Sequence, residues 1–208
     1  MSKIVFIGAG NVVRNMSSSV IKAGHTILQF IGKNSNKSKI LSEQYNCEYT
    51  NSLNDINQEG DIYIISVSDD EIIEVLKSLK LKKDKIVTHT SGSVSIDIFK
   101  DYFNKYGVIY PLQTFYAENK IDFKEVPLLI EANDFKAKEK IFDFAKSISN
   151  NVFEISSEKR MIIHIAAVFA INFTNHLITI SYDILKREKI PVDILKPIIV
   201  ESSKKYYN

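Results

Sequence analysis

The pattern of hydrophobic and polar positions divides the chain into two parts. From Lys3 to about Ser157, short β-branched runs alternate with helical patterns, which is typical of βαβ units and a mostly parallel sheet. After Ser157 the pattern is helical throughout, and Pro191 and Pro197 mark a break and a fresh helix start. We predict an α/β fold: a Rossmann-like, doubly wound, mostly parallel sheet over residues 1–157, followed by a small all-α unit over residues 158–208.

The same alternation places the individual elements. Apolar runs of strand length predict strands, and apolar positions at helical spacing predict helices. The predicted strands lie near residues 3–7, 26–31, 62–67, 86–90, 107–110, 127–131 and 152–155. The predicted helices lie near residues 11–23, 36–45, 69–80, 95–105 and 135–148.

Composition and charge narrow the classes of function. The chain carries 27 Lys and Arg against 25 Asp and Glu, a net charge of +2, and 45% hydrophobic residues, which argues against a nucleic-acid binder that relies on a basic field. Its single cysteine, Cys47, can form no intramolecular disulfide, and no Cys/His spacing indicates a metal site. We therefore expect a cytoplasmic protein without a bound metal. The apolar stretch Met161–Phe173 contains His164 and Asn172 and predicts a buried helix, not a membrane span.

A glycine turn follows the first predicted strand, in the sequence KIVFIGAGNVV. Gly8 and Gly10 stand between a buried strand and a helix, where small residues let backbone N–H groups and the helix dipole face a pyrophosphate. Asn11 and Val12 open that helix, and Val13 occupies the third motif position, where Gly or Ala is usual. The turn predicts a dinucleotide site; a plain strand-to-helix connection is the alternative.

The end of the second predicted strand distinguishes NADP from NAD. An NAD-binding protein normally carries Asp or Glu there to hold the ribose hydroxyls, and this chain has no carboxylate at that point. Lys33, Asn34 and Ser35, with Lys37 beyond them, can instead bind a 2′-phosphate through charge-assisted hydrogen bonds. We predict NADP. The alternative is a solvated helix start in a lysine-rich protein.

Polar turns follow three further predicted strands. Because ligands of open α/β sheets bind over the carboxyl ends of the strands, we expect these turns to line one cleft. The first should flank the nicotinamide ribose, and the other two should meet the substrate; alternatively, Ser93 or Ser95 only caps a helix. The residues predicted for this cleft are Ser66, Val67, Ser68, His89, Ser91 and Gln113.

The apolar segment from Met161 to Leu185 carries a stripe of polar residues on one face of its helical wheel. We predict that Asn172 and His164 of this stripe face the substrate. The alternative is a set of hydrogen bonds between helices or within a dimer interface. The stripe consists of His164, Asn172, Asn175, His176, Thr179 and Asp183.

Together, GAGNV, HTSGS, YPLQTF and HIAAVFAINFTNHL resemble a known family. They look like bacterial Rossmann-like proteins with a C-terminal helical domain of unknown function, relatives of pyrroline-5-carboxylate reductase and deazaflavin-dependent NADP oxidoreductases. The resemblance implies an NAD(P)-binding domain, a helical dimerisation domain and oxidoreductase activity. Tyr110 stands where the family pattern has His. The chain also ends at Asn208, before a QTGPA-like motif, so we expect a shortened helical domain or an incomplete cleft.

These observations predict an NADP-dependent oxidoreductase that transfers hydride to or from a small polar C=O or C=N substrate. Ser91, Gln113 and Asn172 would orient that substrate, and His89 or His164 is the candidate general acid. The competing prediction is an NADP-binding sensor or scaffold without turnover; a methyltransferase-like protein agrees less well with the HTSGS turn. The apolar C-terminal helices predict a homodimer, and no nucleic-acid or membrane partner is expected.

Overall fold

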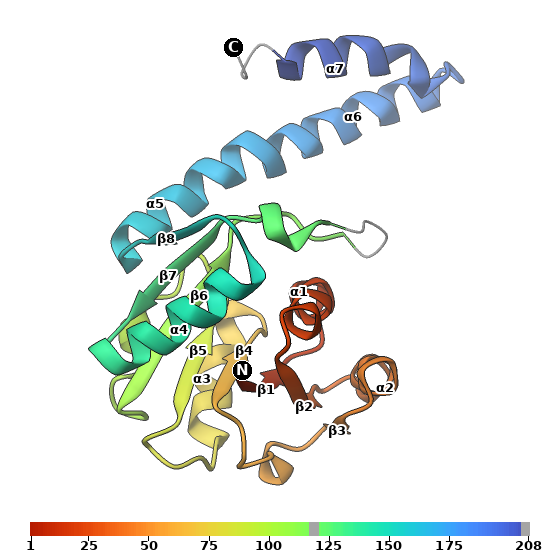
Figure 1. The fold of residues 1–208 in the computed structure, drawn as a ribbon. Coiled ribbons are helices and arrows are strands. Elements are labelled where there is room, and N and C mark those ends of the chain that lie inside the picture. The colour runs from red at the N-terminus through yellow and green to blue at the C-terminus, as the bar shows by residue number, and fades with distance from the viewer. Residues whose placement is uncertain (117–120, 205–208) are drawn as a thin grey trace. The chain divides into compact units, whose positions relative to one another are not determined.

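The computed structural model describes residues 1–116 and 121–204, except the side chain of Ser35 (Figure 1). Its sheet has the strand order β3-β2-β1-β4-β5-β6-β7-β8, and β6–β7 is its antiparallel pair. This confirms the predicted Rossmann-like fold. The strands are β1 (Lys3–Ile7), β2 (Thr26–Ile31), β3 (Glu48–Thr50), β4 (Ile62–Ile65), β5 (Ile86–His89), β6 (Lys105–Pro111), β7 (Leu128–Ala132) and β8 (Val152–Glu154). The helices are α1 (Asn11–Lys22), α2 (Ser35–Tyr45), α3 (Asp69–Ser78), α4 (Phe135–Ile148), α5 (Ser157–Ala167), α6 (Thr174–Arg187) and α7 (Lys196–Lys204).

Helices cover both faces of the sheet (Figure 1). On one face, Met16 of α1 and Ile141 of α4 belong to the same buried cluster as Phe6 of β1. On the other face, Ile72 of α3 is buried together with Val5 of β1. Strands of this kind are apolar on both sides, which is why the sequence shows continuous apolar runs instead of alternation.

Two elements of the structure differ from the predictions. β3 was not predicted, because its three residues are too few to establish a period. The predicted helix over residues 95–105 is a single 3₁₀ turn, Ile96–Phe99, in which the Ser95 hydroxyl accepts from the Asp97 amide. Phe99 and Phe103 are buried at helical spacing, but the chain enters β6 at Lys105, so tertiary packing and not a continued helix explains these apolar positions.

The first turns of α5 are attached to the sheet by a buried arginine. The Arg160 side chain is 1% exposed, and its Nη1 lies 2.6 Å from a carboxylate oxygen of Glu131 in β7. Its Nη2 donates to the carbonyl of Val94 at 2.6 Å and to the Ser157 hydroxyl at 3.1 Å. A buried charge needs such partners because desolvation is costly. They hold the start of α5 against β7 and the loop after β5.

The chain contains two compact units, Met1–His164 and Ile165–Asn208. The predicted boundary at residue 157 coincides with the start of α5, although the first turns of that helix belong to the sheet unit. Residues Val168–Phe173, between α5 and α6, form a π-helix. A π-helix has more residues per turn than an α-helix, so the angular positions that we assigned to the polar stripe do not hold across this segment.

One helix of the described residues, Ser157–Arg187, is long and apolar enough to cross a membrane. It has 31 residues, and its most apolar window has a mean hydropathy of 1.6 with none of its residues buried. A helix that packs against another protein meets the same criteria of length and composition. The expected absence of a membrane partner therefore stays a prediction.

Candidate functional site

The carboxyl ends of the parallel strands meet at one edge of the sheet, as predicted. Ile7, the last residue of β1, pairs with Ile31 of β2 on one side and with Ile65 of β4 on the other. Ile65 in turn pairs with His89 of β5. The chain order reverses between β1 and β4, and this is the point at which doubly wound sheets bind their ligands.

Gly8 makes the turn after β1 possible. It has φ +118°, a region that L side chains rarely adopt, and a Cβ at this position would lie 2.1 Å from the carbonyl oxygen of Ser66. The Gly8 amide donates to the carbonyl of Ile31 at 2.6 Å, and the Ser66 amide donates to the carbonyl of Ile7 at 2.7 Å. The glycine is thus required for the close contact between the turn after β1 and the end of β4.

The amino end of α1 remains open to a ligand. Its N-cap, Gly10, provides no side-chain cap, and its first turn contains no acidic residue. A Cβ on Gly10 would have no heavy atom within 4 Å, so the space beside the start of the helix is open. Uncapped amides at a helix N-terminus favour an anion, and this end of α1 therefore fits a dinucleotide pyrophosphate. Val13, the departure from the glycine motif, is fully buried in the core below.

Two of the predicted cofactor residues lie beside this turn. Asn11 is exposed and donates from Nδ2 to the carbonyl of Phe115 at 3.0 Å, which connects α1 to the loop after β6. Val12 is partly buried against the core. Their backbone amides, and not their side chains, are the groups available for a pyrophosphate.

Lys33 forms an ion pair in the structure. Its Nζ lies 2.5 Å from one carboxylate oxygen of Glu71, and the Ser68 hydroxyl donates to the other at 2.6 Å. The hydrogen bonds from Lys33 and Ser68 lower the pKa of Glu71 to about 2. Asn34 caps α2 by accepting from the Lys37 amide at 3.3 Å. A 2′-phosphate would therefore compete with Glu71 for Lys33. The sequence alone did not predict the ion pair between Lys33 and Glu71. The side chain of Ser35 lies outside the described part of the structure.

Ser66 and Val67 have different environments at the end of β4. The hydroxyl of Ser66 accepts a hydrogen bond from the Thr90 hydroxyl at 3.0 Å, which joins the turns after β4 and β5. Val67 is partly buried against the core on the α3 side. Ser66 therefore presents a hydroxyl at the edge of the sheet, whereas the Val67 side chain contributes to the core.

His89 is a structural residue. It is fully buried and stacks on Phe99 with ring centroids 5.4 Å apart, and its Nδ1 accepts from the Ser91 amide at 3.1 Å. Burial and the nearby charge of Arg160 lower the pKa of His89 to about 3. Its prediction as a cofactor contact and general acid is corrected, because the imidazole is fully buried and neutral at neutral pH, so it has no proton to supply there; its Nε2 has no hydrogen-bond partner among the described residues.

The hydroxyl of Ser91 stabilises its own turn. It accepts from the amides of Ser93 and Val94, each at 3.1 Å, while the Ser93 hydroxyl donates to the carboxylate of Asp69. Asp69 thus lies at the start of α3, as expected, and also contacts the HTSGS turn. Gln113 is exposed in the loop after β6, where its Oε1 accepts from the Thr114 amide at 2.9 Å.

His164 contacts the site through Tyr110. The Tyr110 hydroxyl, near the carboxyl end of β6, lies 2.9 Å from Nδ1 of His164 on α5. The sequence reasoning treated Tyr110 only as a departure from a family pattern, and 54 residues separate the two in the chain. Asn172 is exposed in the second unit, so its substrate role stays a prediction.

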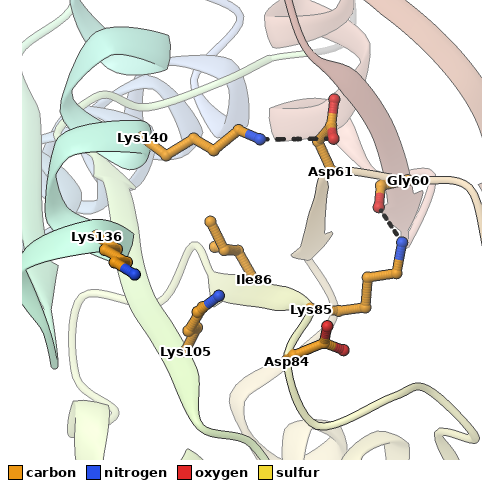
Figure 2. Close-up of a pocket in the computed structure, with 8 residues that line it drawn as sticks. All are labelled: Gly60, Asp61, Asp84, Lys85, Ile86, Lys105, Lys136 and Lys140. Carbon is orange, nitrogen blue, oxygen red and sulfur yellow. Dashed lines mark hydrogen bonds and ion pairs between the residues drawn. The ribbon is translucent and has the colours of Figure 1, made fainter.

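A hollow of about 190 Å³ lies at the opposite edge of the sheet, at the amino ends of β4, β5 and β6 (Figure 2). Lys140 pairs there with Asp61 at 3.5 Å, and Lys85 donates to the carbonyl of Gly60 at 3.0 Å. Ligands of doubly wound sheets bind at the carboxyl ends, so this hollow is separate from the candidate site. Its lining consists of Gly60, Asp61, Asp84, Lys85, Ile86, Lys105, Lys136 and Lys140.

The fold and the open α1 turn define a Rossmann-type dinucleotide-binding protein. Residues 3–91 match the family model "NADP oxidoreductase coenzyme F420-dependent", and residues 126–208 match a domain of unknown function. A protein of Bacteroides fragilis named "putative NADP oxidoreductase" is 32% identical with a TM-score of 0.94, over 100% of this chain and 81% of that one. The chain therefore belongs to this family of NADP-dependent oxidoreductases. No curated protein matches it.

Two more distant structures share the fold. Pyrroline-5-carboxylate reductase of Streptococcus pyogenes is 17% identical with a TM-score of 0.73, over 100% of this chain and 80% of that one. A reductive aminase of Aspergillus terreus, in complex with NADPH and ethyl levulinate, is 12% identical with a TM-score of 0.75, over 100% and 75%. The predicted resemblance to reductases of this type is confirmed at the level of the fold.

Gly8→Ala and Gly10→Ala should affect different properties, stability in the first case and cofactor binding in the second. We expect Gly8→Ala to lower the free energy of unfolding by about 2 to 3 kcal/mol, because φ and the Ser66 carbonyl both oppose a side chain. Gly10→Ala should change it by less than about 1 kcal/mol yet weaken NADPH binding at least about tenfold, because the methyl group enters the space where a pyrophosphate would approach the backbone. Urea unfolding measures the free energy of unfolding, and calorimetric titration measures NADPH affinity. If the two variants lost the same stability and the same affinity, the separate roles assigned to Gly8 and Gly10 would be contradicted.

Proposed function

We propose that this protein binds NADP at the α1 turn and transfers hydride to or from a small polar C=O or C=N compound in the cytoplasm. The observation that carries the proposal is the uncapped first turn of α1 at the crossover of the sheet. Two structurally similar enzymes support it, since a reductive aminase and a pyrroline-5-carboxylate reductase are named for compounds of these classes. A single cysteine, Cys47, agrees with a reducing compartment.

In this proposal each group of residues has a distinct task. The backbone from Gly8 to Val12 binds the pyrophosphate, and Lys33 with Asn34 binds the 2′-phosphate. The stretch Ser66–Ser68 contacts the nicotinamide ribose. When bound, NADP supplies the hydride chemistry, so the protein's part is to position the reactants and to provide a proton. Ser91, Gln113 and Asn172 remain the proposed substrate contacts.

A substrate screen tests turnover. NADPH oxidation is followed at 340 nm with cyclic imines, 2-oxo acids and aldehydes, and we expect at least one class to be reduced. The Asn172→Ala variant should then lower kcat/KM by about tenfold, the value of one hydrogen bond to a charged or polar substrate group. Tight NADPH binding without turnover of any class would favour the non-catalytic sensor instead.

The pairing of Lys33 with Glu71 predicts a separable effect on cofactor choice. Lys33→Ala should weaken NADPH binding by about tenfold through the loss of one charge-assisted hydrogen bond, with little change for NADH. Glu71→Gln should strengthen NADPH binding, because it frees Lys33 and removes a negative charge near the 2′-phosphate. Calorimetric titration with both cofactors measures this. Equal losses for NADPH and NADH in Lys33→Ala would exclude Lys33 as a 2′-phosphate ligand.

We also propose a homodimer, because the second unit exposes many apolar side chains. None of its described residues is buried, and large apolar side chains such as Phe169 and Leu177 are 64% and 65% exposed. An apolar surface this continuous indicates an interface, and most soluble oligomers pair identical copies. A second copy of the chain is therefore the proposed partner.

Light scattering tests the dimer directly. We expect twice the mass of one chain for the wild type and one chain for Leu177→Lys, because a lysine cannot be buried there without a partner. Glu188→Lys, which adds a positive charge at an exposed polar position of the same unit, is the matched control and should stay dimeric. A monomeric wild type at micromolar concentration would contradict the proposal.

A further inference from the structure

Tyr110 and His164 form a hydrogen-bonded pair at the carboxyl edge of the sheet. The phenol oxygen and Nδ1 are 2.9 Å apart, and the rings meet edge to face, with centroids 5.8 Å apart and an interplanar angle of 79°. Tyr110 comes from β6 and His164 from α5, both within the sheet unit. Both side chains are partly exposed, so the pair can meet a ligand as well as solvent.

Gly92 brings this pair against the HTSGS turn. A Cβ on Gly92 would lie 2.6 Å from Nδ1 of His164 and 2.8 Å from Cζ of Tyr110. Any other residue would displace one of the two rings. The pair therefore occupies its position because the turn has no side chain there, beside Ser91 and the end of β5.

Arg160 anchors the part of α5 that carries His164. The two residues are four positions apart on α5 and so lie on the same face of the helix. Arg160 is held by Glu131 and by the carbonyl of Val94, both at 2.6 Å. A histidine on a helix anchored in this way is positioned before any ligand arrives, which is what proton transfer requires.

Three other polar side chains near the pair, His89, Ser91 and Ser93, are turned to structural contacts, although Nε2 of the buried His89 has no hydrogen-bond partner in the described part of the chain. His89 is buried, with its Nδ1 bonded to the Ser91 amide. The Ser91 hydroxyl accepts two amides of its own turn, and the Ser93 hydroxyl is bonded to Asp69. A group that donates a proton needs access to the substrate and a route for reprotonation, and Tyr110 and His164 are both partly exposed and hydrogen-bonded to each other.

We propose that Tyr110 is the proton donor of the reduction and that His164 positions its hydroxyl and restores its proton. This inference rests on the proposed function. As hydride reaches the carbon of the C=N or C=O bond, the π electron pair moves to nitrogen or oxygen, which takes the proton from the Tyr110 hydroxyl. The phenolate receives the Nδ1 proton of His164 as Nε2 takes up a proton from solvent, so that solvent supplies the one proton that the reduction consumes. Exchange with solvent then returns the imidazole to its Nδ1–H form.

The surroundings agree with this assignment. Burial raises the pKa of Tyr110 above its usual value, the Arg160 charge opposes that effect, and the Asp69 charge adds to it. The phenol is therefore protonated throughout the neutral range and ready to donate. Its phenolate is stabilised in turn by the Nδ1–H of His164 and by the positive charge of Arg160.

The first experiment needs neither cofactor nor substrate. Absorbance at 295 nm is followed against pH, and the difference between the wild type and Tyr110→Phe isolates the titration of Tyr110. His164→Leu should raise the Tyr110 midpoint by about one pH unit, and His164→Gln, whose amide can still donate to the phenolate, should restore part of it. An unchanged midpoint in His164→Leu would overturn the proposed pair, whether or not the protein turns over a substrate.

The second experiment uses the compound reduced in the NADPH screen. Tyr110→Phe should lower kcat by about 10² to 10⁴ with the NADPH dissociation constant unchanged, and His164→Leu should lower kcat less, with partial recovery in His164→Gln. Tyr106→Phe, on the same strand, is the matched control and should keep wild-type turnover. Full activity in Tyr110→Phe would overturn the proton-donor role alone, whereas failure of the wild type to bind NADPH would overturn the proposed function and this role with it.

Discussion

The contact between the turn after β1 and the end of β4 is the constraint on which the rest of the site depends. A side chain at Gly8 would lie 2.1 Å from the Ser66 carbonyl, so the two backbones touch where the strand order reverses. This contact sets the start of α1, and with it the direction of the uncapped amides. The polar turns after β4 and β5 then follow at the same edge, joined by the hydrogen bond between Ser66 and Thr90.

A second constraint acts on α5. Arg160 is almost completely buried, and a guanidinium in that environment must be satisfied by close acceptors. Glu131 and the carbonyl of Val94 supply them, one from β7 and the other from the loop after β5. The cost of burying this charge thus fixes the helix that carries His164 relative to the strand that carries Tyr110. The two glycines Gly8 and Gly92 allow close contacts of different kinds: the first between backbones and the second between a turn and two rings.

The sequence predicted most of the architecture because the strands of a parallel sheet are buried on both faces and therefore appear as continuous apolar runs. β1 and α1 were predicted almost to the residue, and the glycine turn between them predicted the edge of the sheet at which a cofactor would bind. Short elements were missed or misjudged: β3 has three residues, and Phe99 and Phe103 resemble a helix although each is buried by packing. Single-residue roles were harder still. His89 looks like a candidate acid in the sequence, but its burial against Phe99 is a property of the folded core.

The amino-acid sequence by itself determined the fold class, the glycine turn after β1 and the absence of a carboxylate at the end of β2, because these depend on local spacing. Only the tertiary structure decided which polar groups meet. Lys33 and Glu71 are 38 residues apart, and Tyr110 and His164 are 54 apart, so no periodicity in the chain connects them. Their contacts follow from strand order, from the missing Cβ of Gly92 and from the desolvation of Arg160, which are properties of the packed molecule.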